Sequence, residues 1–336
     1  LKSFDKDYFQ SFNLSVNTFP GKMKLKLGND PDLVPGVDFI VSPYAHSVKG
    51  NFSVCYLDKQ TLTHKKSRKK FLSEKPNDCF VLINMSELNE DDKFFLNREL
   101  FADRDFAAGI LLLTEEKLTW GGQSFFTTLP IIELDKKRVG KIPSNISVDI
   151  ESETIDNYRC FNVCGYIPGS SKADSLIVFT AHYDHLGRMG AETYFPGAND
   201  NASGVAMLLT LADYYSKPEN KSPYTMVFIA FAGEELGLLG SRYFTDHSLF
   251  DLKKIKQLIN MDIVGTGDEG ITIVNAKENI QLYNTMMKTN EEKKYLTKIL
   301  ARANTENSDH YPFTLKKVPS VFIYTMGGSK AYHDIY

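Results

Sequence analysis

The chain has 336 residues, of which 42% are hydrophobic, and its formal net charge is −3. This apolar content excludes a disordered chain, and the length suits two domains better than one. The charge gives no overall attraction to nucleic acid or to an anionic membrane, and no apolar run reaches the roughly 18 residues that would span a bilayer.

The first half of the chain is rich in short apolar runs, charges and turn residues. We predict strands at residues 37–42, 52–56, 79–83 and 108–113, and a helix-like stretch at 92–103. The basic run at 64–70 is expected to be a solvated loop or strand edge rather than a binding patch. We expect residues 25–142 to form a small β-rich domain, inserted after a segment, residues 1–24, that belongs to the larger domain.

The four cysteines are expected to be free thiols. Cys160 and Cys164 lie four residues apart in an extended run, so about 13 Å separates them, which is too far for a disulfide. The low cysteine content fits a cytoplasm or a periplasm and does not separate the two.

The second half alternates strands with helices. Strands are predicted at 175–180, 225–231, 255–262 and 320–325, and helices at 203–215, with Ser203 as the N-cap, and at 236–244. Near-continuous apolar strands separated by helices indicate an α/β domain, residues 143–336, with a mainly parallel sheet covered on both faces.

Polar residues follow the predicted strands, at the edge where open α/β sheets bind ligands. His182 follows the first strand, and a lone histidine there is more often packed than a ligand. Asp184 shifts this balance, because a metal-bound imidazole usually donates its other N–H to a carboxylate. Asp200, before a helix, is either a helix-initiating residue or a carboxylate that bridges two metal ions.

Two adjacent carboxylates, Glu234 and Glu235, follow the second strand. They are either exposed acids in the first turn of a helix, where the helix dipole favours them, or a metal ligand beside a general base. Asp262 ends a strand and His333 lies near the end of the chain, and each is a weak signal alone. Together these residues suit two zinc ions that share a bridging water.

The motifs AHYDHLG, GANDNASGVA, FAGEELGLLGS, NMDIVG, SDHYPF and AYHD occur in this order between residues 145 and 336. In this region the chain resembles the di-zinc aminopeptidases of the twenty-eighth metallopeptidase family. That family also contains glutaminyl cyclases, the glutamate carboxypeptidase II type and the transferrin receptors. The resemblance implies a three-layer, phosphorylase/hydrolase-like peptidase domain with a central mixed, mainly parallel sheet. It also implies that residues 25–142 are a protease-associated insert and that both ends of the chain are trimmed.

Matched residue by residue, the resemblance implies a complete set of zinc ligands. His182, Asp200 and Asp262 would bind one zinc ion, and Asp200, Glu235 and His333 would bind the other, so that Asp200 bridges the pair.

The resemblance also assigns roles in the reaction. Glu234 matches the general base, Asp184 matches the carboxylate that orients the first histidine, and Tyr332 matches a tyrosine that stabilises the oxyanion. It further implies a cis peptide bond between Asp200 and Asn201. His310 is a candidate for supporting the ligands or lining the substrate pocket, and a plain loop role is equally open.

The function that the resemblance implies is removal of residues from peptides with a free amino end. A glutaminyl cyclase would typically have Asp in place of Ala232 and Trp in place of Tyr332. A carboxypeptidase of the glutamate carboxypeptidase II type stays open, whereas a receptor-like binding protein would be expected to have lost ligands. Relatives with such an insert are mostly secreted, periplasmic or membrane-anchored, so we expect a secreted, periplasmic or outer-surface protein.

Overall fold

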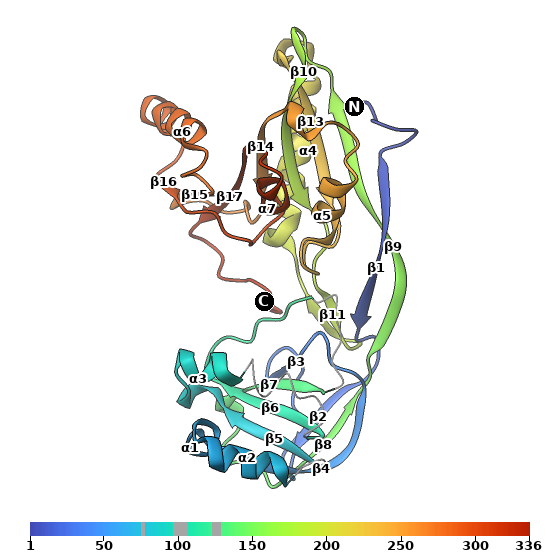
Figure 1. Cartoon of the computed structure of the whole chain (residues 1–336), viewed down its shortest axis with the longest axis vertical. Coiled ribbons are helices and arrows are strands. Elements are labelled where there is room, and N and C mark those ends of the chain that lie inside the picture. The colour runs from blue at the N-terminus through green and yellow to red at the C-terminus, as the bar shows by residue number, and fades with distance from the viewer. Residues whose placement is uncertain (75–77, 97–106, 123–128) are drawn as a thin grey trace. The chain divides into compact units, whose positions relative to one another are not determined.

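The computed structural model describes residues 1–74, 78–96, 107–122 and 129–336. They form two compact units (Figure 1). The first unit comprises Leu1–Leu14, Asn157–His185 and Gly197–Tyr332, and the second comprises Ser15–Asp156, Leu186–Pro196 and His333–Tyr336. The range expected for the insert, 25–142, lies inside the second unit, which extends further on both sides.

The first unit is built on a mixed sheet. In spatial order its described strands are β1 (Phe9–Thr18), β9 (Glu153–Ile167), β13 (Tyr224–Phe231), β10 (Lys172–His182), β14 (Ile255–Met261), β17 (Ser320–Met326), β15 (Gly270–Val274) and β16 (Ile299–Ala301). β10 is parallel to β13 and β14, and β14 is parallel to β17. β9 and β15 pair antiparallel with their neighbours β13 and β17. The four strands predicted in the second half of the chain are therefore present and form the parallel centre of the sheet.

Helices pack on both faces of this sheet. The helices of the first unit are α4 (Ser203–Ser216), α5 (Leu239–Asp246), α6 (Ile280–Lys293) and α7 (His310–Leu315), with short helical turns η4 (Ala198–Ala202), η5 (Pro218–Asn220) and η6 (Leu252–Lys254). Phe179 packs with Leu208 of α4 on one face. Its neighbour Val178 packs with Phe244 of α5 and Phe313 of α7 on the other. This alternation follows from the two-residue period of a strand.

The second unit has a sheet of its own. Its described strands, in spatial order, are β2 (Met23–Leu27), β8 (Asn145–Ile150), β4 (Val48–Tyr56), β5 (Cys79–Asn84), β6 (Gly109–Thr114), β7 (Ile131–Asp135) and β3 (Phe39–Val41). β11 (Gly187–Met189) and β12 (Thr193–Phe195) form a separate hairpin. Among the described residues of this unit, the helices are α1 (Lys59–Thr63), α2 (Lys65–Ser73) and α3 (Glu90–Phe95), with turns η1 (Met85–Glu87) and η3 (Lys136–Arg138). Leu62 of α1 packs with Val81 and Ile110 of the sheet.

Several predicted elements differ in the structure. The basic run at 64–70 is helix α2, capped at its start by His64, so the expectation of a loop or strand edge is wrong. Lysine and arginine are good helix formers, and the inner residues Phe71 and Leu72 pack against the core beneath. Helix α3 ends at Phe95 with Leu96 as its C-cap, and residues 97–103 of the predicted range lie outside the described residues. Helix α5 begins at Leu239 rather than 236 because Leu238 is left-handed.

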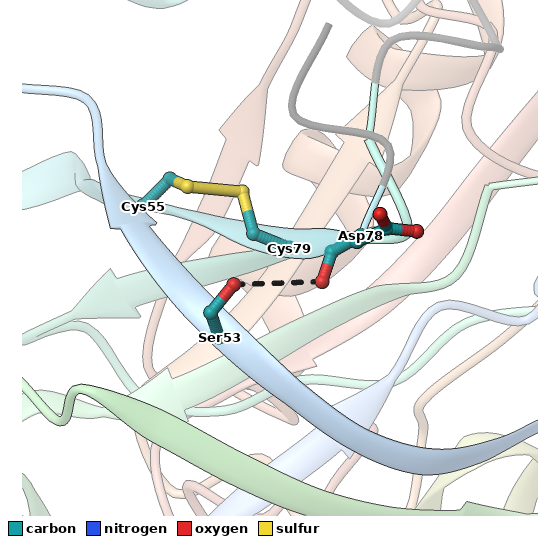
Figure 2. The surroundings of a disulfide bond; sticks show 4 residues. All are labelled: Ser53, Cys55, Asp78 and Cys79. Carbon is teal, nitrogen blue, oxygen red and sulfur yellow. Dashed lines mark hydrogen bonds between the residues drawn. A yellow bond between two sulfur atoms is a disulfide. The ribbon is translucent and has the colours of Figure 1, made fainter.

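Two of the cysteines form a disulfide, Cys55 with Cys79 (Figure 2). Their Cα atoms lie 6.1 Å apart, within the usual range for a disulfide. In the register of β4 and β5, Ser53 lies beside Cys79. Cys55 is two residues further along β4, so its side chain projects from the same face of the sheet as that of Ser53. The expectation of four free thiols is wrong for this pair, whereas Cys160 and Cys164 are free, as predicted.

No helix in the described ranges combines the length and the apolar character needed to cross a bilayer.

Candidate metal centre

Three parallel strands end at one edge of the first sheet and deliver most of the predicted site. His182 is the last residue of β10 and lies in register with Phe231, the last residue of β13. Glu234 and Glu235 follow β13 directly, and Asp262 follows β14. Because the carboxyl ends of adjacent parallel strands meet at the same edge, residues far apart in sequence are brought together there.

The turn that carries Asp200 is tied to the end of β14. The peptide bond between Asp200 and Asn201 is cis, as predicted. The Asn201 side chain donates from Nδ2 to the carbonyl oxygen of Met261 over 3.0 Å. Its Oδ1 accepts from the backbone N–H of Ile263 over 3.3 Å. These hydrogen bonds hold the turn against the segment that contains Asp262.

Helix α4 begins at this turn, but Ser203 is not its N-cap as predicted. Ser203 is the first residue of α4, and its hydroxyl accepts from the backbone N–H of Val264 over 2.9 Å. The N-cap is Ala202, which makes no side-chain capping bond. One residue earlier, Asn201 Oδ1 accepts from the N–H of Gly204 over 2.9 Å. A Cβ atom at Gly204 would collide with Asn201 and with the Met261 carbonyl, so this close approach requires glycine.

Four of the five predicted ligands, all but His333, lie with Glu234 in two overlapping clusters. Ligand atoms of His182, Asp200 and Glu235 all lie within 4.8 Å of one another, and so do those of His182, Glu234 and Asp262. The Nε2 atom of His182 is 3.2 Å from Asp200 Oδ1 and 3.3 Å from Asp262 Oδ1. The second cluster includes Glu234, which the resemblance assigns as the general base.

The negative charges of the carboxylates in these clusters would be stabilised by a bound cation. Two like charges about 4 Å apart repel by about 4 kcal/mol at an effective dielectric constant of 20. Burial lowers the pKa of His182, but Asp262 and Asp200 outweigh it and raise the pKa well above its ordinary value. One imidazole cannot balance four carboxylates. Nitrogen and carboxylate donors at this density fit a divalent ion such as zinc.

Asp184 organises the site through both its carbonyl and its carboxylate. His182 Nδ1 donates to the Asp184 carbonyl oxygen over 3.1 Å, and the nearest carboxylate oxygen lies farther away, at 3.8 Å. The carboxylate accepts the backbone N–H groups of Glu234 and Glu235, each over 3.2 Å. Asp184 therefore directs Nε2 of His182 towards the other ligands and fixes the backbone that carries the two glutamates.

A buried chain of hydrogen bonds supports Asp262, and sequence reasoning missed it. Ser308 Oγ donates to Asp262 Oδ2 over 2.7 Å, and Asn260 Nδ2 donates to Ser308 Oγ over 2.7 Å. Thr180 Oγ1 donates in turn to Asn260 Oδ1 over 2.6 Å. Thr180, Asn260 and Ser308 are fully buried. The signal was present in the sequence, since Ser308 opens the SDHYPF motif and Asn260 opens NMDIVG.

Tyr332 and His333 follow β17, the last strand in the sequence. Burial raises the pKa of Tyr332, and the carboxylates of Asp200 and Glu235 raise it further, so its hydroxyl stays protonated. His333 belongs to the second unit, where its carbonyl oxygen accepts from the backbone N–H of Trp120 over 2.8 Å. The role of His333 as a zinc ligand stays a prediction.

His310 is the first residue of α7. Its ring is fully buried and lies 5.7 Å from the ring of Phe322. Burial lowers the pKa of His310 to about 4, so the imidazole is neutral at physiological pH. Within the described residues neither ring nitrogen has a hydrogen-bond partner, so what the structure shows for His310 is apolar packing.

Residues 162–336 match the model of peptidase family M28, and this segment is just over half of the chain. The chain belongs to peptidase family M28.

Similar proteins of known sequence include aminopeptidases. Aminopeptidase YwaD of Bacillus subtilis is 30% identical over 190 residues, which cover 55% of this chain and 40% of YwaD. A probable leucine aminopeptidase of Trichophyton verrucosum is 30% identical over 178 residues, which cover 50% of this chain and 46% of that protein. This M28 chain spans less than half the length of these curated relatives.

Similar solved structures cover nearly the whole chain. BSAP, a zinc aminopeptidase from Bacillus subtilis, has a TM-score of 0.68 and 19% identity, covering 97% of this chain and 77% of that one. An aminopeptidase from Aneurinibacillus sp. strain AM-1 has a TM-score of 0.66 and 20% identity over the same shares. At this identity the likeness shows the fold: a mixed α/β architecture with more than one sheet.

Proposed function

We propose that this chain is a zinc-dependent aminopeptidase that holds two zinc ions. His182, Asp200 and Asp262 would hold one ion, and Asp200, Glu235 and His333 would hold the other. The observation that carries the proposal is one buried imidazole surrounded by carboxylates at the carboxyl edge of the sheet, in a chain of family M28. A three-layer peptidase domain would present this edge to the substrate.

Glu234 acts as the general base. Bound zinc supplies a Lewis acid for the scissile carbonyl and lowers the pKa of the attacking water. Glu234 takes the proton from this water and passes it to the leaving amine. Burial raises the pKa of Glu234 well above its ordinary value, so its carboxylate is a stronger base than that of an exposed glutamate. Asp184 supports this role because it holds the Glu234 backbone N–H.

Tyr332 donates a hydrogen bond to the oxyanion that develops on the substrate. The raised pKa of its hydroxyl keeps the proton in place across the working pH range. The donor then stabilises charge that is present only during the reaction, which is the kind of interaction that accelerates the chemical step.

The substrates are peptides with a free amino end. Relatives named as aminopeptidases support this class, and Ala232 and Tyr332 stand where the resemblance expects Asp and Trp in a cyclase. The second unit is proposed to be a protease-associated insert. A secreted, periplasmic or outer-surface location is supported by the Cys55–Cys79 disulfide, since disulfides persist in oxidising compartments.

The test combines metal analysis with a choice of substrates. We expect about two zinc ions per chain by elemental analysis and release of p-nitroaniline from aminoacyl p-nitroanilides. The same substrates with an acetylated amino group should not react. Cleavage of blocked peptides at their carboxyl end would identify a carboxypeptidase, and ring formation from glutaminyl peptides would identify a cyclase. Either result would overturn the aminopeptidase assignment.

A further inference from the structure

His185 lies between two parts of the ligand cluster, although no role was predicted for it. Its Nδ1 atom is 2.8 Å from Glu235 Oε1, and the two side chains are only 12% and 7% exposed. An ionised carboxylate can only accept hydrogen bonds, so Nδ1 carries the hydrogen and donates it. A charge-assisted hydrogen bond of this kind, shielded from water, belongs to the stronger class.

The base of the His185 side chain lies close to Gly197, at the start of the turn that carries Asp200. A Cβ atom at Gly197 would come within 2.7 Å of His185 Cγ and within 2.6 Å of the Asp200 carbonyl oxygen. The ring therefore packs against bare backbone at the start of the turn. His185 thus contacts the side chain of one ligand and the backbone turn of another, and Glu235 and Asp200 share a cluster with His182.

Asp184 and His185, which follow β10, contact different parts of Glu235. Asp184 fixes the Glu235 backbone N–H, whereas His185 fixes one oxygen of its carboxylate. A glutamate side chain has three rotatable bonds, and a backbone contact restricts none of them. Without a second contact, the carboxylate would have to be ordered at the moment of metal binding, which weakens affinity.

We propose that His185 is a positioning residue. It holds the Glu235 carboxylate ready to bind its zinc ion, the one that Asp200 and His333 would also bind. This inference rests on the proposed zinc peptidase function. Removal of residues that orient metal ligands typically weakens metal affinity by about 10–100-fold. We therefore expect the loss of His185 to weaken one of the two zinc sites by this factor and to leave the other within about threefold of its original affinity.

The experiment compares three variants of the full chain. His185→Ala removes the ring, His185→Asn keeps an amide N–H near the place of Nδ1, and Tyr183→Phe is the control. The Tyr183 hydroxyl donates to the backbone carbonyl of Phe161 over 2.7 Å. Metal-free proteins are titrated with zinc against a chelator, and with cobalt while the visible absorption of each bound ion is followed. Circular dichroism of the metal-free proteins confirms that each variant is folded.

The expected result is that His185→Ala raises the dissociation constant of one ion by about 10–100-fold and changes its cobalt spectrum. His185→Asn should recover most of this loss, and Tyr183→Phe should match the original chain. Unchanged affinities and spectra in His185→Ala would overturn the inference and leave the proposed function intact. If both His185 variants failed to bind one ion at every zinc concentration, His185 would be a zinc ligand itself. This result would also overturn the inference that it is a positioning residue. An original chain that binds no zinc would overturn both proposals.

Discussion

The hydrogen-bond chain behind Asp262 gives a prediction whose size can be worked out from the structure. Ser308→Ala removes the hydroxyl that stands between Asn260 and Asp262. The substitution leaves two buried groups without a partner: the N–H of the Asn260 amide and one oxygen of the Asp262 carboxylate. Thr180→Val keeps the side-chain shape and leaves a single neutral acceptor, the Asn260 Oδ1 atom, without its donor.

The expected magnitudes follow from these counts. An unpaired buried polar group costs about 1–3 kcal/mol, and a charged one costs more. Thr180→Val should therefore lower the free energy of unfolding by about 1–3 kcal/mol, and Ser308→Ala by roughly 2–5 kcal/mol. Ser308→Ala should also weaken zinc binding, because Asp262 Oδ2 is no longer held and the carboxylate can rotate away from His182.

The assay is equilibrium urea unfolding of the metal-free chain, followed by circular dichroism. Thr210→Val serves as the matched control, because the Thr210 hydroxyl is exposed on α4 and bonds only to a carbonyl of its own helix, over 2.8 Å. Its effect should stay within about 0.5 kcal/mol. If the buried variants cost no more than this control, or if Thr180→Val costs more than Ser308→Ala, the reasoning is refuted.

Three further predictions concern chemistry, charge and metal. Glu234→Gln, which cannot accept a proton, should lower kcat by at least about 10²-fold while zinc content stays near two, and normal turnover would contradict its role as base. Hydrogen bonds from the Thr61 backbone N–H and hydroxyl lower the pKa of Asp58, so its contribution to stability is present above about pH 4 and is lost as the pH falls through the folded-state pKa. Asp58→Asn should remove this dependence, and urea unfolding of both proteins between about pH 6 and pH 3 should show the difference in stability shrinking with acid. Removal of zinc by a chelator should lower the melting temperature, and added zinc should restore it in a concentration-dependent manner; a melting temperature insensitive to zinc would count against the metal centre.

The parallel core of the first unit could be predicted because burial on both faces leaves a continuous apolar run in the sequence. The segments at 175–180 and 225–231 read as strands for this reason, and they form β10 and β13. Helix α2 could not be predicted in the same way, because its sequence is mostly basic and shows no regular spacing of apolar residues. Its helical state depends on the core beneath Phe71 and Leu72.

The meeting of the candidate ligands His182 and Asp262 at one sheet edge could be predicted, whereas their supporting contacts could not. His182 and Asp262 directly follow strands, so their place at one edge follows from parallel pairing alone. The bond between Asn260 and Ser308 joins residues 48 positions apart, and it depends on the register of β14 and on where α7 begins. The disulfide was missed for a similar reason, since Cys55 and Cys79 meet only through the pairing of β4 with β5.

The division of the chain between its units has a consequence for folding during synthesis. β1 ends at Thr18, but its neighbour in the sheet, β9, begins only at Glu153. Residues 15–156 therefore leave the ribosome before the first unit can complete that edge of its sheet. During this interval β1 remains an unpaired strand edge, the kind of surface that attracts the wrong partner. A chaperone that covers β1 until β9 has emerged would protect the order of assembly that this topology requires.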